Sequence, residues 1–330
     1  MSRAGRLAVC PRTLCSHEPF RAALASGAED VRWNDSGRRL AGEELVSFLQ
    51  DAEQAVVGIE RLDARSVARL PSLRVVAKFG VGLDNLDLDA LEAAGVRVGW
   101  TPGVNRRAVA ELVLAGALSL MRGLPEGDRQ IRAGALAAGT WRADLGRQLA
   151  DQHVGIIGCG HVGLEVARLM RALGARVSAH DILDRSEWLE PLGVPQVSLD
   201  ELCRTADIVT LHTPLDESTR GLIGRQRLEQ LKPGAIVVNT ARGELIDEVA
   251  LLAALDAGRV GGAVLDVLRE EPAAPGPLVR HPRVLVSAHI GGSTEQSVRA
   301  MAGAALRNLS EAVPVPALRA RLRAARIEPL

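Results

Sequence analysis

A glycine-rich segment near the middle of the chain has the spacing of a phosphate-binding turn. Gly158, Gly160 and Gly163 follow an apolar run at residues 153–157 and open a helical pattern, and Asp181 ends the next apolar run. Glycines at this spacing allow a tight bend, a close approach of a pyrophosphate to the backbone, and close packing of helix on strand. The helix N-terminus adds free N–H groups and a partial positive charge. The pattern alone is weak, but its place between strand and helix, with an acidic residue following, predicts a dinucleotide site.

Asp181 bears on which dinucleotide is bound. Its carboxylate can accept hydrogen bonds from the adenosine ribose hydroxyls and would repel a 2′-phosphate. No Arg follows it immediately, since the next basic residue is Arg185. The sequence therefore favours NAD over NADP as the cofactor.

Three later apolar runs are each followed by a side chain of a catalytic type. Arg242 follows the run at residues 235–239, Glu271 follows the run at 262–267, and His289 follows the run at 284–287. Ligands of open α/β sheets bind outside the carboxyl ends of the strands, so these side chains could converge on the nicotinamide. Taken singly, such a His is more often structural and such an Arg is more often a solvated loop charge. Three together beside a dinucleotide turn favour a catalytic set.

The elements that must position these groups are strands and helices in alternation. Besides the runs above, apolar runs occur at residues 6–10, 30–33, 55–59, 73–78, 96–100, 176–180 and 207–211, with helical patterns such as 164–173 between them. Most runs are continuously apolar, as expected of strands buried on both faces of a parallel sheet. We therefore predict an α/β fold with two doubly wound parallel-sheet domains.

The order of these elements predicts a discontinuous first domain. A long helix is expected at about residues 105–122, followed by a Gly-rich stretch at 123–146. The last helix begins near Ser293 and has no strand to follow, so it could return to the first domain. We predict a flavodoxin-like substrate domain at residues 1–104 and 293–330, and a Rossmann NAD-binding domain at 105–292. The Pro- and Arg-rich tail at 314–330 is expected to pack loosely.

Composition excludes several other classes of protein. The 330 residues hold 40 basic and 40 acidic side chains, so no net field draws the chain to nucleic acid or a membrane. The four cysteines form no CxxC pair and no zinc-type cluster, so we expect no bound metal ion. We also expect no disulfide framework in a chain of this length, which favours a location in the reducing cytoplasm. The longest apolar helical stretch, at residues 110–121, is too short to span a bilayer, and no signal peptide is expected.

The sequence resembles the D-isomer-specific 2-hydroxyacid dehydrogenases, within them the D-3-phosphoglycerate dehydrogenase-like branch. The resemblance runs from about residue 56 to 294 and includes the glycine turn, Lys78-Phe-Gly80-Val81-Gly82-Leu-Asp84-Asn85, residues 105–111, Leu211-His212-Thr213-Pro214, and the segments of Arg242, Glu271 and His289. It implies NAD-dependent oxidation of a D-2-hydroxy acid, or the reverse reduction of a 2-keto acid. His289 would be the general acid/base, Glu271 would fix its tautomer and raise its pKa, and Arg242 would bind the substrate carboxylate.

The same resemblance implies the residues that hold cofactor and substrate. Those expected at the cofactor are Gly158, Gly160, His161, Val162, Gly163, Asp181, Thr213, Pro214, Thr240, Ala241, Asp266, Gly291 and Gly292. Those expected at the substrate are Lys78, Gly80, Val81, Gly82, Asn105 and Arg106, with backbone N–H groups near Gly80–Gly82 holding one end of the carboxylate.

The chain departs from the family pattern in two places. Where phosphoglycerate dehydrogenases carry an Arg-Ser pair that helps to bind the substrate phosphate, this chain reads Gly58-Ile59-Glu60, and a carboxylate would repel a phosphate. Lys78, Arg106 and Arg107 remain as anion partners, so phosphoglycerate, hydroxypyruvate or glyoxylate, and a bulkier polar 2-hydroxy acid all stay open. The chain also leaves no room for a C-terminal regulatory domain, so feedback by that route is not expected.

Two readings outside simple catalysis follow from the same fold. Relatives of this fold also act as NAD-responsive corepressors, which would make the chain a regulator, whereas a dead scaffold would have lost His289 or Arg242. Members of the family are usually homodimers. The long helix from Asn105 and the stretch after it are expected to reach the partner through apolar residues, namely Leu124, Ile131, Leu136 and Trp141.

Overall fold

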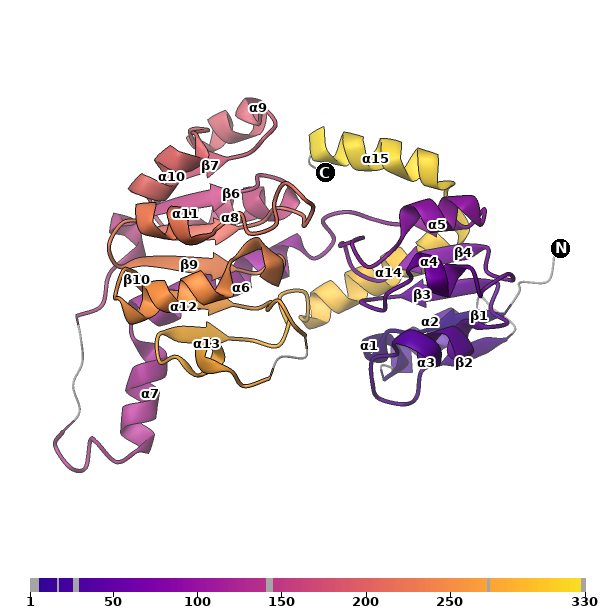
Figure 1. Cartoon of the computed structure of the whole chain (residues 1–330), viewed down its shortest axis with the longest axis horizontal. Coiled ribbons are helices and arrows are strands. Elements are labelled where there is room, and N and C mark those ends of the chain that lie inside the picture. Colours follow the sequence, from indigo (N-terminus) through magenta and orange to yellow (C-terminus); the bar gives the residue numbers. More distant parts are fainter. Residues whose placement is uncertain (1–5, 17, 26–29, 141–144, 272–273, 328–330) are drawn as a thin grey trace. The chain divides into compact units, whose positions relative to one another are not determined.

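The computed structural model describes residues 6–16, 18–25, 30–140, 145–271 and 274–327. The chain divides into two compact units, which we call the first unit (Met1–Asn105 and Gly292–Leu330) and the second unit (Arg106–Gly291). These boundaries lie one residue from those expected, because Asn105 and Gly292 both belong to the first unit. The chain thus enters the second unit after Asn105 and returns to the first at Gly292 (Figure 1).

The first unit is built on a parallel sheet. Among its described residues the sheet has five strands in the order β2-β1-β3-β4-β5, which is the flavodoxin-like order. The strands are β1 (Leu7–Val9), β2 (Val31–Trp33), β3 (Gln54–Val57), β4 (Val75–Lys78) and β5 (Arg97–Gly99). The helices that precede the second unit are α1 (Arg12–Cys15), α2 (Glu18–Ala25), α3 (Gly42–Leu49), α4 (Ala64–Val67) and α5 (Leu88–Ala93). Apolar residues on β1, β3 and β4 are fully buried, as their continuous runs predict.

Two C-terminal helices complete the first unit. Helix α14 (Glu295–Glu311) begins where the Thr294 side chain accepts a hydrogen bond from the Ser297 N–H, and it packs so closely on β5 that a Cβ at Gly99 would overlap the Asn308 carbonyl. The expectation of a loosely packed tail is wrong. Residues Val315–Ile327 form α15, and Val315 and Leu318 are each 1% exposed in the core of the first unit.

The second unit is a doubly wound sheet. Its described strands are parallel and lie in the order β11-β10-β9-β8-β6-β7. They are β6 (His153–Ile157), β7 (Arg176–His180), β8 (Ile208–Leu211), β9 (Ala235–Asn239), β10 (Val260–Leu265) and β11 (Val284–Val286). The strand order reverses between β6 and β8, and this switch point is where α/β sheets of this kind bind ligands.

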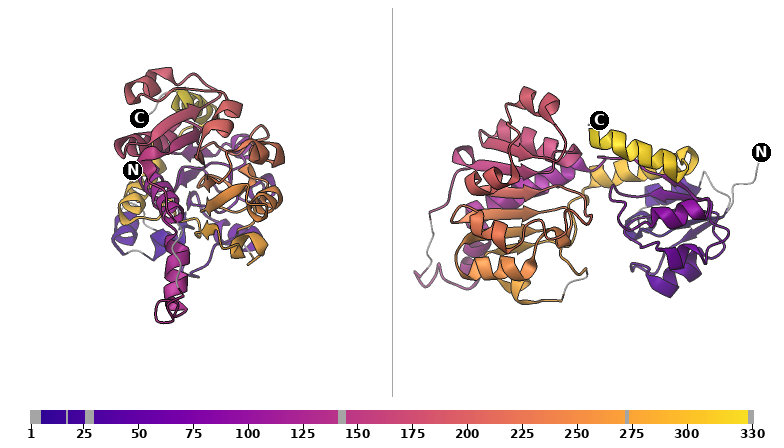
Figure 2. Two further views of the ribbon diagram at one scale, coloured as in Figure 1. Left: turned by 90° about the vertical axis from the view of Figure 1, so that its left-hand side faces the viewer. Right: turned by 45° about the horizontal axis from the view of Figure 1, so that its top comes forward.

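Helices cover both faces of this sheet. On one face α6 (Arg106–Met121) and α8 (His161–Ala172) form a core with Ile156 of β6, and a Cβ at Gly116 of α6 would meet Val264 at 2.5 Å. On the other face α10 (Leu199–Thr205), α11 (Arg225–Gln230) and α12 (Glu248–Asp256) pack with Ile157 (Figures 1 and 2). Because neighbouring residues of one strand feed opposite cores, the continuous apolar runs are explained and the doubly wound α/β class is confirmed.

Shorter helices fill the connections of the second unit. They are α7 (Leu124–Arg132), η1 (Leu149–Asp151), α9 (Ser186–Leu189), η2 (Glu190–Leu192), η3 (Gly243–Leu245) and α13 (Pro277–Arg280). Helix α7 occupies part of the Gly-rich stretch after α6 and projects from the sheet of its own unit (Figures 1 and 2). In the described ranges no single helix is long and apolar enough to cross a membrane, although α6 and α7 together, bent by 60°, reach that length and composition.

Candidate dinucleotide and acid/base site

The turn after β6 has the geometry that its glycines predict. Gly158 has a φ of +93°, and a Cβ there would lie 2.8 Å from the carbonyl of His212, in the loop after β8. A Cβ at Gly163 would overlap the carbonyl oxygen of Gly158, so the start of α8 packs directly against the turn. A Cβ at Gly160 would instead meet open space. Two of the glycines therefore serve packing, and Gly160 leaves the backbone accessible at the switch point of the sheet.

Several buried polar atoms around this turn have no hydrogen-bond partner within the described part of the chain. They are both ring nitrogens of His161, the hydroxyl of Thr213 after β8, and the hydroxyl of Thr240 after β9. Burial, together with the positive charges of Arg106 and Arg185, lowers the pKa of His161, so this imidazole is neutral at pH 7. Buried polar groups in proteins are rarely left without a hydrogen-bond partner, so we expect a bound polar molecule to supply the partners of these atoms. All three residues were expected at the cofactor, and the turn fits a dinucleotide.

Asp181 lies at the end of β7 beside the same turn. Its Oδ2 accepts a hydrogen bond from the Cys159 N–H at 2.8 Å, and its Oδ1 accepts one from the Leu183 N–H at 2.9 Å. The side chain of Arg185 approaches Oδ2, with Nε at 3.4 Å. The carboxylate is thus fixed by two backbone donors, and a carboxylate retains further lone pairs for ribose hydroxyls.

Arg242, Glu271 and His289, which we call the acid/base cluster, follow three adjacent strands, β9, β10 and β11. His289 Nδ1 lies 2.8 Å from Glu271 Oε2, and Glu271 Oε1 accepts a hydrogen bond from the Leu268 N–H at 3.1 Å. Partial burial opposes ionisation of Glu271, but the hydrogen bond with His289, the Leu268 N–H and the charge of Arg242 outweigh it and lower the pKa of Glu271. An ionised carboxylate only accepts hydrogen bonds, so Nδ1 carries the proton and Nε2 is left for exchange.

The turn that presents Arg242 is shaped by a residue that sequence reasoning missed. The Asn239 side chain, buried at the end of β9, accepts a hydrogen bond from the Ala241 N–H at 3.0 Å and donates one to the Arg242 carbonyl at 2.8 Å. An Asn that bonds its own backbone two residues later is a common turn device, and its place at a strand end was the available signal.

Asp266 holds the loop of His289. Its side chain is 1% exposed and accepts hydrogen bonds from the Ser287 hydroxyl at 2.6 Å, the Ile290 N–H at 2.8 Å and the Gly291 N–H at 2.7 Å. His289 itself has a φ of +54°, a left-handed conformation that non-glycine residues rarely adopt. Asp266 was expected at the cofactor; its visible contacts are those of a positioning residue, and the sequence offers no spacing rule that would have revealed them.

The remaining expected cofactor residues are distributed around the same strand ends. Val162 lies in the first turn of α8, Pro214 is exposed beside Thr213, and Ala241 lies between Thr240 and Arg242. Gly291 ends the second unit, whereas Gly292 belongs to the first. Among the residues described there is no group of three or more His, Cys, Asp or Glu side chains arranged to hold a metal ion.

The residues expected at the substrate lie mainly in the first unit, where the structure brings Lys78 and Glu60 into one network. Lys78 is 5% exposed and donates to the Gly58 carbonyl and to the Asn85 side chain. Glu60 is 2% exposed and accepts a hydrogen bond from the Gly58 N–H at 2.6 Å. The backbone N–H and the backbone carbonyl of Gly58 therefore link the carboxylate and the ammonium at the carboxyl ends of β3 and β4.

The other expected substrate residues divide between the units. Gly80 has a φ of +111°, Val81 accepts a hydrogen bond from the Trp100 ring N–H at 2.8 Å, Gly82 follows it, and the buried side-chain oxygen of Asn105 has no partner in the part of the chain described. Arg106 begins α6 in the second unit. Its neighbour Arg107, expected to be available to an anion, pairs with Glu111 at 2.6 Å and Glu165 at 3.1 Å.

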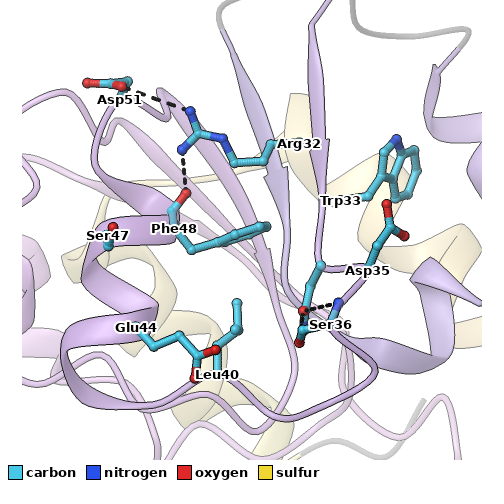
Figure 3. Close-up of a pocket in the computed structure, with 10 residues that line it drawn as sticks. Arg32, Trp33, Asp35, Ser36, Leu40, Glu44, Ser47, Phe48 and Asp51 are labelled. Carbon is cyan, nitrogen blue, oxygen red and sulfur yellow. Dashed lines mark hydrogen bonds and ion pairs between the residues drawn. The ribbon is translucent and has the colours of Figure 1, made fainter.

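A pocket of about 550 Å³ in the first unit lies elsewhere, between β2 and α3. Figure 3 shows Arg32 reaching from β2 to the Phe48 carbonyl, 2.6 Å away, and toward Asp51. Asp35, on the same wall, pairs with Arg21 at 2.5 Å. Of the charged side chains that line this pocket, Arg32 pairs with Asp51, whereas Asp35 and Glu44 pair with arginines outside the lining. None of the expected site residues lines it.

Comparison with known proteins identifies the family. Residues 114–291 match the family model described as D-isomer specific 2-hydroxyacid dehydrogenase, NAD binding domain. The D-3-phosphoglycerate dehydrogenase of Mycobacterium tuberculosis is 36% identical over 282 residues, which are 84% of this chain and 52% of that protein. The enzyme of the same name from Archaeoglobus fulgidus is 36% identical over 262 residues, 78% of this chain and 49% of that protein. The chain spans about half the length of these relatives.

Solved structures match nearly the whole chain. The TT0316 protein of Thermus thermophilus is 35% identical with a TM-score of 0.79, covering 92% of this chain and 96% of that chain. A glyoxylate reductase from Paecilomyes thermophila is 28% identical with a TM-score of 0.81, covering 94% and 95%. The glycine turn, the acid/base cluster and these matches agree, and the chain belongs to the D-isomer specific 2-hydroxyacid dehydrogenase family.

Proposed function

We propose that the protein catalyses the NAD-dependent oxidation of a D-2-hydroxy acid and the reverse reduction of a 2-keto acid. The observation that carries this proposal is the 2.8 Å bond between His289 and Glu271, at strand ends adjacent to that of Arg242 and in one sheet with the glycine turn. Bound NAD would take up the hydride from C2 on oxidation and return it on reduction. The relatives named as dehydrogenases and as a glyoxylate reductase support the same chemistry.

Each member of the acid/base cluster has a distinct task in this reaction. On oxidation His289 Nε2 takes the proton of the C2 hydroxyl, and on reduction it returns that proton to the C2 oxygen. The ionised Glu271 holds the imidazole in the tautomer that leaves Nε2 free and stabilises the imidazolium that forms. Arg242 binds the substrate carboxylate through its planar guanidinium, which orients C2 and polarises its oxygen.

We infer that the substrate is polar and not phosphorylated. Glu60 brings a buried negative charge to the carboxyl end of the first sheet, and the ammonium of Lys78 already bonds to two protein oxygens. Arg107 is likewise paired with two carboxylates. A phosphate dianion would therefore meet repulsion without an obvious counter-charge among these groups, which favours hydroxypyruvate, glyoxylate or a larger polar 2-keto acid.

The deciding experiment is NADH oxidation by the purified protein with 3-phosphohydroxypyruvate, hydroxypyruvate and glyoxylate side by side. We expect turnover with at least one unphosphorylated compound and a lower kcat/KM for the phosphorylated one. Glu60→Gln removes the charge and should raise kcat/KM for 3-phosphohydroxypyruvate by about fivefold, equivalent to ~1 kcal/mol. Glu53→Gln, at the other end of β3, is the matched control. A wild-type preference for the phosphorylated compound would contradict the substrate inference, and tight NADH binding without turnover of any 2-keto acid would favour a regulator.

We further propose that the protein is a cytoplasmic homodimer whose second copy covers α7. The described cysteines are all buried and free, which suits a reducing compartment. Helix α7 has no buried residue, and Leu124, Ile131 and Leu136 in and after it are exposed. The fourth expected contact, Trp141, lies outside the described residues. Apolar side chains gathered on a projecting helix favour a protein partner.

Solution scattering tests the homodimer. At micromolar concentration the wild type should have about twice the monomer mass, and Leu124→Asp with Ile131→Asp should give monomers because each carboxylate would be buried at the interface. Leu173→Asp, at an exposed apolar position after α8, is the control and should stay dimeric. A monomeric wild type would remove the proposal.

A further inference from the structure

We propose that Arg185 gives the ribose end of the dinucleotide site a subsite for a 2′-phosphate, so that the protein binds NADPH as well as NADH. The inference rests on the proposed dinucleotide site and adds to it. The carboxylate of Asp181 by itself predicts exclusion of NADPH, but in the folded chain this carboxylate is paired with Arg185.

The first observation is the ion pair itself. Arg185 Nε lies 3.4 Å from Asp181 Oδ2, and the two side chains are only 5% and 9% exposed. At this depth the interaction between charges is screened far less than at the surface. The ribose end of the site therefore presents a nearly neutral pair, and the repulsion that a lone carboxylate would exert on a 2′-phosphate is largely cancelled.

The second observation is that Arg185 is held in this place from several sides. Its backbone N–H donates to Gln196 Oε1 at 2.8 Å, and the side-chain amide of Gln196 donates in turn to the Asp181 carbonyl at 3.1 Å and the Leu183 carbonyl at 2.8 Å. The guanidinium carbon lies 4.8 Å from the centre of the Trp188 ring. Stacking on an aromatic ring fixes the plane of the guanidinium at little entropic cost. The arginine is therefore part of the built site and not a loop charge in solvent.

The third observation is spare bonding capacity on the cation. Arg185 Nε is too buried to contact a ligand and makes no hydrogen bond with the described residues, so contact with a 2′-phosphate would come from the terminal nitrogens of the guanidinium. A guanidinium offers five N–H donors in a planar fork that matches a phosphate. Asp181, in contrast, keeps its two backbone donors whether or not Arg185 is present. Arg185 can thus serve the phosphate of NADPH while Asp181 serves the ribose hydroxyls of NADH.

Equilibrium binding separates this role from a purely structural one. The dissociation constants of NADH and NADPH are measured by nicotinamide fluorescence, without a 2-keto acid, for the full chain and for Arg185→Gln. We expect the wild-type constants to lie within about tenfold of each other. Arg185→Gln should weaken NADPH by roughly tenfold or more, as for loss of a charge-assisted hydrogen bond, and NADH by less than about threefold. Arg204→Gln, an exposed arginine in the last turn of α10, is the control.

Two further variants keep the test decisive. Arg185→Lys retains the charge, so it should keep more NADPH affinity than Arg185→Gln even if the glutamine variant is destabilised. Asp181→Asn removes the remaining negative charge and should make NADPH the tighter ligand. The proposal is overturned if the wild type binds NADPH more than about a hundredfold more weakly than NADH, or if Arg185→Gln weakens both cofactors equally. A wild type that binds neither dinucleotide would contradict the proposed function instead.

Discussion

Replacing His289 by Asn should lower kcat for 2-keto acid reduction by about 10²–10⁴-fold, the usual contribution of a positioned general acid/base. The substitution removes Nε2, the nitrogen that does not bond to Glu271 and that exchanges a proton with the C2 oxygen in the proposed mechanism. Asn is chosen over Ala because His289 has a φ of +54°, and Asn tolerates the left-handed region better than other non-glycine residues. The loop and its bonds to Asp266 should therefore survive.

The NADH dissociation constant is the internal control for this variant and should stay within about twofold, as for changes outside a binding contact. His281→Asn, at the end of α13, controls for loss of an imidazole in the same unit and should turn over nearly as fast as the wild type. Turnover of His289→Asn within tenfold of the wild type would mean that another group exchanges the proton.

The second large effect is expected at Arg242. Arg242→Gln should lower kcat/KM for a 2-keto acid by roughly 10²–10³-fold, because truncating one partner of a charge pair costs about 2–5 kcal/mol. Much of the loss should appear in KM, since in the proposed mechanism the guanidinium binds the substrate carboxylate before the reaction as well as during it. Arg242→Lys should recover little, because a single ammonium cannot reproduce the bidentate fork.

Steady-state kinetics at saturating NADH measures this change. Arg269→Gln, an exposed arginine in the loop after β10, is the matched control for removing a cation from this edge of the sheet. An unchanged KM with normal kcat in Arg242→Gln would exclude Arg242 as the carboxylate ligand. The backbone N–H groups around Gly80–Gly82 of the first unit would then be the remaining candidates for binding the carboxylate.

The strands of both sheets could be predicted because their apolar runs are continuous and their sheets are covered on both faces. Each expected run contains or overlaps a described strand, and the two-domain α/β fold is confirmed. Helix α15 was missed because prolines stand at residues 314 and 316 and four Arg follow them, although Val315 and Leu318 are three residues apart on one helical face. The burial of these two side chains, and not the composition of the segment, decides its structure.

The candidate site shows a similar division. Gly158, Gly163 and the order of Arg242, Glu271 and His289 could be predicted from local spacing because each lies in a segment that directly follows an apolar run. The bonds of Asp266 to the His289 loop and the pairing of Arg185 with Asp181 arise only from folded geometry. No periodicity marks which donor will meet a carboxylate across a loop, so such positioning contacts need coordinates.

The insertion of the second unit into the first has a consequence for synthesis of the chain. Residues 106–291 are continuous, so the second unit is complete on the ribosome before α14 and α15 have been made. The first unit, whose strands are made earliest, lacks part of its core until Val315 and Leu318 emerge. Domains generally fold as units in the order of their synthesis, but here the part of the chain that is translated first finishes folding last. The strands of the first unit therefore keep apolar surface uncovered while residues 106–291 are synthesised.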